Sequence, residues 1–199
     1  MRARLISGVV LAAGPSTRFV ARDPKQLAEI AGEPLVLRVV RTALASRLSE
    51  VIVVVGHQAS RVRAAIAGHP VSIVENTAFS QGQSTSVRAG LSKVDPGAAA
   101  AMFIPVDQPD LTGSVLDALI DTYQSTDAMI VVPSFRGRRG APVLIDRSLF
   151  AELKSIGGDS GGRQIFSRYE DRIVEVAMSS DKALRDVDRV EDLDRYLGE

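Results

Sequence analysis

Short apolar runs rich in β-branched residues alternate along the chain with segments of helical periodicity, and this alternation constrains the fold more than any other feature. The runs predicted to be strands are Ser7–Leu11, Val51–Val55, Val71–Val74, Ala101–Pro105 and Met129–Val132. Most are apolar at every position, as is typical of parallel strands covered on both faces. Helices are predicted between them, over Leu35–Ser46, Ala59–Ala67, Ser84–Leu91 and Ser114–Tyr123. The pattern predicts one α/β domain over residues 1–199, a three-layer α/β/α sandwich with a mainly parallel, Rossmann-like sheet.

The composition excludes several classes of chemistry. Lysine plus arginine (24) equals aspartate plus glutamate (24), so the formal net charge is zero and no overall positive field attracts nucleic acid or an anionic membrane. The chain has no cysteine, which excludes disulfides, thiolate zinc sites, iron–sulfur clusters and a cysteine nucleophile. No apolar run reaches the roughly 18 residues that a membrane span needs. The N-terminus lacks the layout of a signal peptide, so we expect a cytoplasmic protein.

The loop after the first strand has the features of a phosphate-binding segment. It reads Leu11-Ala12-Ala13-Gly14, followed by Arg18 and, after a gap, Lys25. Small residues let backbone amides approach a polyphosphate, and two cations suit the charge that develops in phosphoryl-type transfer. The alternative is a turn with two solvated basic residues. Neither the Gly-Lys pair of a Walker loop nor a G-x-G-x-x-G fingerprint occurs in the chain.

Two later loops also follow predicted strands, at the edge where parallel sheets bind ligands. Gly82, Gln83 and Ser84 precede a helix, where their polar groups suit a nucleotide base; the alternative is a helix cap. Asp107 ends the strand Ala101–Pro105 and is placed to hold a hard cation; the alternative is an Asx-type turn.

The last third of the chain offers weaker signals. Residues 140–143 form a predicted loop or hairpin that suits an acceptor molecule, and residues 157–163 suit either an anion or a flexible turn. Asp186 and Asp188 precede a final helix. We expect them to point to opposite faces of an extended segment, so that only one faces a metal.

Taken in order along nearly the whole chain, these segments resemble the MobA-like nucleotidyltransferase family, and most of all its molybdenum cofactor cytidylyltransferase branch. The resemblance rests on Leu11–Arg18 with Lys25, Gly32–Leu35, Gly82–Ser86, Val106–Leu111, Gly140–Val143, Gly158–Arg163 and Asp186–Leu193. The Leu-Ala-Ala-Gly sequence resembles that of the cytidylyl branch. The guanylyl branch more often carries two glycines at this position.

The resemblance implies a Mg²⁺-dependent enzyme that transfers CMP from CTP to a phosphorylated acceptor, molybdopterin above all, with release of pyrophosphate. It implies triphosphate binding by the loop Leu11–Gly14 with Arg18 and Lys25, and base or ribose contacts from Gly82, Gln83 and Ser84. Asp107 would bind Mg²⁺, with Asp188 as the second carboxylate and Asp186 as the less favoured choice. It also implies a molybdenum hydroxylase as a client.

Three departures from the family pattern stand near the implied site. The family usually has a glycine behind the arginine and a shorter step to the lysine, whereas residues 19–24 intervene here. Ala141 replaces a common histidine, and Arg189-Val190 follows Asp188 where Thr-Pro is common. The rival functions are a guanylyl- or sugar-type nucleotidyltransferase, an NAD(P)H-dependent reductase of a small heteroaromatic substrate, and a binding protein that delivers a cofactor without turnover.

Overall fold

A mixed β-sheet forms the centre of the computed structural model, which describes residues 4–19, 23–158 and 161–196, without the side chains of residues 161–164. Its strands are β1 (Ile6–Ala12), β4 (Glu50–Val55), β5 (Ser72–Glu75), β6 (Ala100–Pro105), β7 (Ile130–Phe135), β8 (Arg138–Arg139), β9 (Val143–Asp146) and β10 (Ile173–Ala177). They lie in the order β10-β7-β9-β6-β1-β4-β5, and β8 pairs with β7. A separate small hairpin joins β2 (Glu29–Ile30) to β3 (Glu33–Pro34).

Parallel pairing dominates the centre of the sheet. β1 pairs in parallel with β4 and with β6, β4 pairs in parallel with β5, and β10 pairs in parallel with β7. β9 runs antiparallel between β6 and β7. The chain reverses after β7 in a two-residue turn, Arg136-Gly137, whose φ angles of 50° and 73° are those of a hairpin turn that matches strand twist. The predicted mainly parallel sheet is confirmed.

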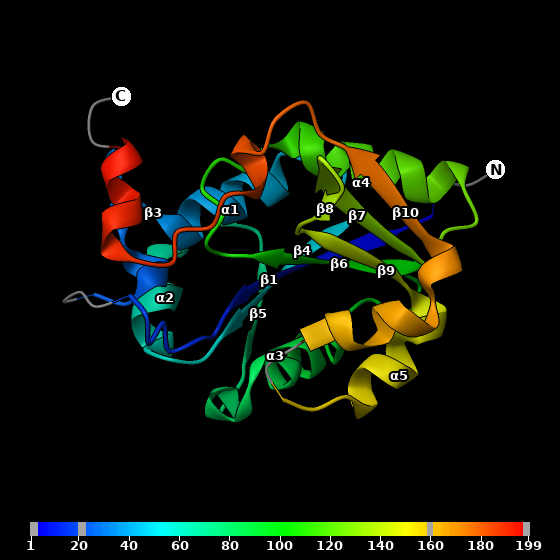
Figure 1. The fold of residues 1–199 in the computed structure, drawn as a ribbon. Helices are drawn as coiled ribbons and strands as arrows, with labels where there is room; N and C mark the ends of the chain where they lie inside the picture. Colours follow the sequence, from blue (N-terminus) through cyan, green and yellow to red (C-terminus); the bar gives the residue numbers. More distant parts are fainter. Residues whose placement is uncertain (1–3, 20–22, 159–160, 197–199) are drawn as a thin grey trace.

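Helices cover both faces of the sheet, as the three-layer prediction requires (Figure 1). One face is covered by α1 (Leu35–Leu44), α2 (Ala59–Ala65) and α4 (Gly113–Ser125), and the other by α3 (Gln83–Leu91) and α5 (Phe150–Ser155). Each face has its own core: Val40, Leu116 and Tyr123 belong to the first, and Val87 and Leu153 to the second. None of the helices in the described ranges is long and apolar enough to cross a membrane.

The predicted strands and helices are all present, with ends that differ by at most three residues. β10 has no counterpart in the sequence prediction. It lies at the sheet edge with a half-exposed pattern, so it lacks the continuous apolar run that marks the buried strands.

A third, smaller cluster connects the two ends of the chain. Phe19, Leu35 and Val187 are buried in it, and Leu193 and Tyr196 pack against it. The C-terminal segment thereby lies against the loop that follows β1. Tyr196 also donates a hydrogen bond to Asp110 at 2.8 Å, and this contact together with burial raises the pKa of Tyr196 to about 12.

Candidate active site

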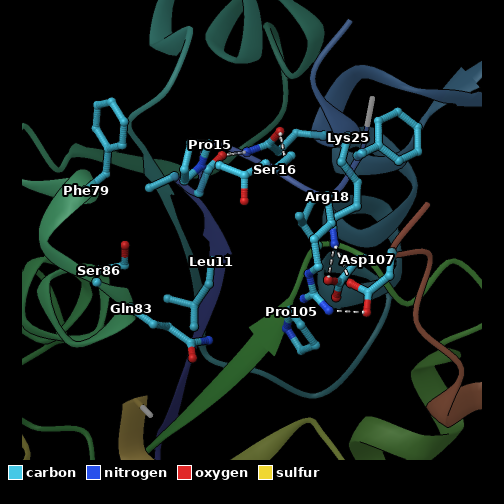
Figure 2. Close-up of a pocket in the computed structure, with 18 of the residues that line it drawn as sticks. Leu11, Pro15, Ser16, Arg18, Lys25, Phe79, Gln83, Ser86, Pro105 and Asp107 are labelled. Atoms are coloured by element: carbon cyan, nitrogen blue, oxygen red, sulfur yellow. Dashed lines mark hydrogen bonds and ion pairs between the residues drawn. The ribbon is translucent and has the colours of Figure 1, made fainter. Parts of the chain in front are cut away.

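A cavity of about 590 Å³ lies beyond the carboxyl ends of β1 and β6. This first cavity is lined by Leu11, residues 13–19, Lys25, Gln26, Phe79, Ser80, Gly82, Gln83, Ser86, residues 105–107 and Asp188. Figure 2 shows Phe79, Gln83 and Ser86 on one side and Arg18, Lys25 and Asp107 on the opposite side. One wall is therefore uncharged, with Gln83 and Ser86 as polar side chains beside Phe79, and the other wall carries charge.

The charged wall holds two cations and two carboxylates in contact. The Lys25 Nζ atom lies 2.7 Å from Asp107 Oδ2 and 3.3 Å from Asp188 Oδ1. The Arg18 Nη1 atom lies 2.9 Å from Asp188 Oδ2. The Lys25 side chain is only 11% exposed whereas Arg18 is 73% exposed, so the lysine is fixed and the arginine borders solvent. Although more residues separate Arg18 from Lys25 than is usual in the family, Lys25 still contacts both Asp107 and Asp188.

Tertiary hydrogen bonds place Asp188 beside Asp107. Leu11 and Pro105 are partners in the β1–β6 pairing, which puts the loops after the two strands side by side. The Asp107 carbonyl then accepts the Val187 N–H at 2.8 Å. The Asp192 carboxylate accepts the backbone N–H groups of Asp188 and its neighbour at 2.8 and 2.9 Å, and these bonds lower the pKa of Asp192. Asp192 thereby caps the start of the last helical segment, Val190–Tyr196.

Gln26, which the sequence analysis did not single out, holds the first loop, the segment that follows β1, through three side-chain hydrogen bonds. Its Nε2 donates to the carbonyl oxygens of Ala12 at 3.2 Å and Gly14 at 2.5 Å, and its Oε1 accepts from Ser16 Oγ at 3.2 Å. Gln26 is 1% exposed, so these bonds form without competition from water. Its position next to Lys25 was the only available signal.

A second cavity, of about 670 Å³, adjoins the first. Both cavities are lined by Leu11, Arg18, Gln83, Pro105, Asp107 and Asp188. The second alone is lined by Phe103, Val143 and Ile145 and by Arg138, Arg139 and the segment 140–141. Arg139 is engaged with Glu170 and Glu175, and the carboxylates Asp107, Asp186 and Asp188 also line this cavity, so its wall combines apolar, cationic and acidic side chains. Two molecules bound in the two cavities would meet at Asp107 and Asp188.

Most of the predicted site residues lie together at these cavities. Those that line the first cavity are Leu11, Ala13, Gly14, Arg18, Lys25, Gly82, Gln83, Asp107 and Asp188. Ala12 and Ser84 do not line it. Ala12 is fully buried on the opposite face of β1. Ser84 points away from the face that Gln83 shares with Ser86, because helical residues three apart lie on the same side. Ser86 takes the place predicted for Ser84.

The expectation that Asp186 and Asp188 point to opposite faces is wrong. Residues two apart in an extended chain share a face, and Val187 between them is fully buried. Both carboxylates therefore line the second cavity. Gln108 Nε2 donates to Asp186 at 3.0 Å. Desolvation by the surrounding protein raises the pKa of Asp186, and the charge of Asp107 raises it further.

The predicted anion loop at 157–163 lies partly outside the described residues, which lack 159–160 and the side chains of 161–164. The described part contributes the Gly158 carbonyl, which accepts the Ser84 N–H at 3.1 Å.

The residues present fit one magnesium ion that arrives with a phosphate ligand. Within the described ranges, no group of three or more His, Cys, Asp or Glu side chains is arranged to hold a metal. Asp107 and Asp188 nevertheless both contact the Lys25 ammonium, so the two carboxylates lie on either side of a single positive charge. Mg²⁺ is usually bound through one or two carboxylates together with substrate phosphates, so two carboxylates beside a phosphate-binding loop match its needs.

The fold and the site together define a nucleotide-binding α/β protein of the nucleotidyltransferase type: a parallel sheet, a small-residue loop after β1, and carboxylates at the end of β6. The chain belongs to the family of the MobA-like NTP transferase domain, whose model matches residues 8–173.

Individual relatives agree with this family. Nicotine blue oxidoreductase of Paenarthrobacter nicotinovorans is 33% identical over an alignment of 207 positions, gaps included, that covers 96% of each chain. Rv0371c of Mycobacterium tuberculosis superposes with a TM-score of 0.85 at 30% identity, over 99% of this chain and 100% of that one. Its complex with manganese gives a TM-score of 0.80 at 30% identity, over 97% and 98%. GlmU of Heliobacterium modesticaldum is 32% identical over 123 residues, 62% of this chain but only 26% of its own length.

Proposed function

We propose that this protein is a magnesium-dependent cytidylyltransferase that transfers CMP from CTP to a phosphorylated acceptor, molybdopterin or a close relative, and releases pyrophosphate. One observation carries the proposal: two cavities share a wall that contains Asp107, Asp188 and Arg18. A transfer reaction needs a donor and an acceptor that meet at one charged point, and this geometry supplies it.

The chain's own residues suit an in-line displacement at the α-phosphorus. The first loop and Lys25 would bind the triphosphate, while the acceptor's phosphate oxygen attacks from the second cavity. That oxygen is already ionised near neutral pH, so the reaction needs no protein base, and no histidine lines either cavity among the described residues. Mg²⁺ held by Asp107 and Asp188 would neutralise charge on the triphosphate. Arg18 and Lys25 would stabilise the charge on the departing pyrophosphate.

The proposed identities of base, ion and acceptor have separate support. The Ala12-Ala13-Gly14 sequence supports a cytosine nucleotide, and the polar wall of Gln83 and Ser86 offers hydrogen bonds to a base edge. The manganese complex of Rv0371c supports use of a divalent ion. The apolar side chains of the second cavity support an acceptor with a ring system, and Arg138 on its wall supports a phosphate on that acceptor. A molybdenum hydroxylase client stays a prediction.

The similarity to nicotine blue oxidoreductase favours one second candidate, an NAD(P)H-dependent oxidoreductase of a small heteroaromatic substrate. The ADP-ribose part of a dinucleotide would then bind in the first cavity, and the heteroaromatic substrate in the second. The two candidates differ in their ligands, since only the transferase requires a triphosphate with a divalent ion.

We expect CTP with Mg²⁺ to raise the melting temperature by about 5–10 °C at 100 times its Kd. A ligand that binds only the native state stabilises it by about 2.7 kcal/mol at that concentration, and 1 kcal/mol corresponds to about 2–4 °C for a chain of this size. The measurement compares CTP, GTP, ATP, UTP, NADH and NADPH, each with and without Mg²⁺. A shift with NADH or NADPH, and none with any triphosphate, would select the oxidoreductase.

Replacing Gln26 by methionine is expected to weaken CTP binding about 10-fold and to lower the free energy of unfolding by about 1–2 kcal/mol. The change removes three hydrogen bonds that fix the first loop while nearly preserving side-chain volume. Calorimetric titration with CTP and denaturant unfolding measure the two effects. Gln124→Met is the control, because Gln124 makes one long hydrogen bond of 3.5 Å at an exposed position. Equal CTP affinity in both variants would contradict the role of Gln26.

A further inference from the structure

Arg189 follows the site carboxylate Asp188 at a position where the family commonly has threonine, and the proposed reaction does not yet use it. The described residues include no hydrogen-bond or ion-pair partner for its guanidinium. The other arginines near this end of the site are engaged: Arg18 with Asp188, Arg185 with Asp181 and Arg195 with Asp192. An arginine without a partner beside a phosphate-binding site is available for a ligand.

A third cavity, of about 340 Å³, is lined by Arg189, Arg18, Val190 and Glu191. Arg18 lines all three cavities, so the third one opens next to the first. The backbone under Arg189 is held by the Asp192 carboxylate, which accepts its N–H at 2.9 Å. The two arginines therefore approach the same space from the β1 loop and from the C-terminal segment.

The charge and shape of this cavity suit a phosphate anion. Two guanidinium groups face one carboxylate, Glu191, and a guanidinium binds phosphate oxygens through paired N–H donors. Arg18 is already shared with Asp188, so Arg189, which forms no ion pair within the described residues, supplies the second cation of this cavity.

We propose that Arg189 and Arg18 form a binding site for the terminal phosphates of the nucleoside triphosphate, and hence for the pyrophosphate leaving group. This inference rests on the proposed transferase function. In that reaction, the new bond joins the acceptor oxygen to the α-phosphorus. The bond from the α-phosphorus to the oxygen that bridges it to the β-phosphorus breaks, and the electron pair leaves on pyrophosphate. Arg189 stabilises that charge from the side of the third cavity.

The test measures binding of pyrophosphate, CTP and CMP, each with Mg²⁺, by calorimetric titration of the full chain. We expect Arg189→Ala to weaken pyrophosphate and CTP about 10-fold, the loss of one charge-assisted contact, and CMP less than about 2-fold. Glu191→Gln is expected to tighten pyrophosphate about 2-fold, because it removes the opposing charge. Arg63→Ala is the matched control, since Arg63 lies on α2, pairs with Glu75 at the end of β5 and lines none of the three cavities.

The possible failures are distinguishable. If the wild-type protein binds pyrophosphate and CTP but Arg189→Ala binds them equally well, the inference about Arg189 is wrong and the proposed function stands. Equal weakening of CMP would also overturn it, because the effect would not be confined to the terminal phosphates. If the wild-type protein binds neither pyrophosphate nor any triphosphate, the proposed function fails and this inference fails with it. Melting temperatures of all variants check that each one is folded.

Discussion

Asp107→Asn is expected to lower the turnover of CTP by about 10³-fold or more, equivalent to about 4 kcal/mol of transition-state stabilisation. Asparagine preserves the volume of the side chain but removes the negative charge that would hold Mg²⁺. The free energy of unfolding should fall by no more than about 2 kcal/mol, because Lys25 keeps its second partner, Asp188, at 3.3 Å. Pyrophosphate release measures the turnover, and denaturant unfolding measures the stability.

Asp110→Asn is the matched control for this prediction. Asp110 lies three residues further along the same loop, and its carboxylate accepts a hydrogen bond from Tyr196 at 2.8 Å outside all three cavities. An asparagine oxygen can accept the same bond, so we expect nearly wild-type turnover. If Asp107→Asn retained a third of the wild-type turnover, the metal-binding role of Asp107 would be excluded.

The second large effect concerns the packing of α3 on the sheet. A Cβ atom at Gly90 would lie 2.4 Å from Val9 Cγ1 and 3.3 Å from Val54 Cγ2, both on buried strands. Gly90→Ala is therefore expected to lower the free energy of unfolding by about 2–3 kcal/mol, despite a gain of about 1 kcal/mol in helix propensity. Because α3 carries Gln83 and Ser86 at its cavity end, CTP affinity should also fall. Thermal unfolding and CTP titration measure the two effects.

A double-mutant cycle separates this clash from other effects of the substitution. Val9→Ala removes the methyl group that meets the new Cβ atom, and alone it should cost about 2 kcal/mol through the cavity it leaves. Adding Gly90→Ala to that variant should then cost less than about 1 kcal/mol, because the two changes compensate. Additive costs would show that contact with Val9 is not the cause.

The sequence predicted the layers and the sheet because burial leaves a local signal. A strand such as β4 is covered on both faces and is apolar from Val51 to Val55, while a helix such as α1 repeats its apolar residues at helical spacing. The edge strand β10 lacks that signal and was not predicted. The order of strands, with β9 antiparallel between β6 and β7, depends on pairing between distant segments and cannot be read from local patterns.

The candidate site also has features that local sequence patterns predict and features that only the tertiary structure shows. Glycine and small residues after β1, and a carboxylate after β6, could be recognised locally because the carboxyl ends of parallel strands meet at one edge. The contacts that support these residues could not be recognised from local sequence. Gln26 bonds to carbonyl oxygens more than ten residues away, and the Val187 N–H reaches the Asp107 carbonyl across the fold. The prediction that Asp186 and Asp188 face opposite sides was wrong because residues two apart in an extended segment share a face.

By itself the sequence determined the class of fold, and it predicted that the loop after β1, Arg18, Lys25 and Asp107 belong to one site, because these predictions depend on residue type and position after a strand. Only the tertiary structure decided that Lys25 lies between Asp107 and Asp188, that two cavities meet at those carboxylates, and that Arg189 faces a third. Residue 188 reaches residue 25 only through long-range packing of the C-terminal segment against Phe19 and Leu35. Such packing is a property of the whole chain, because its apolar contacts join segments that no local pattern connects.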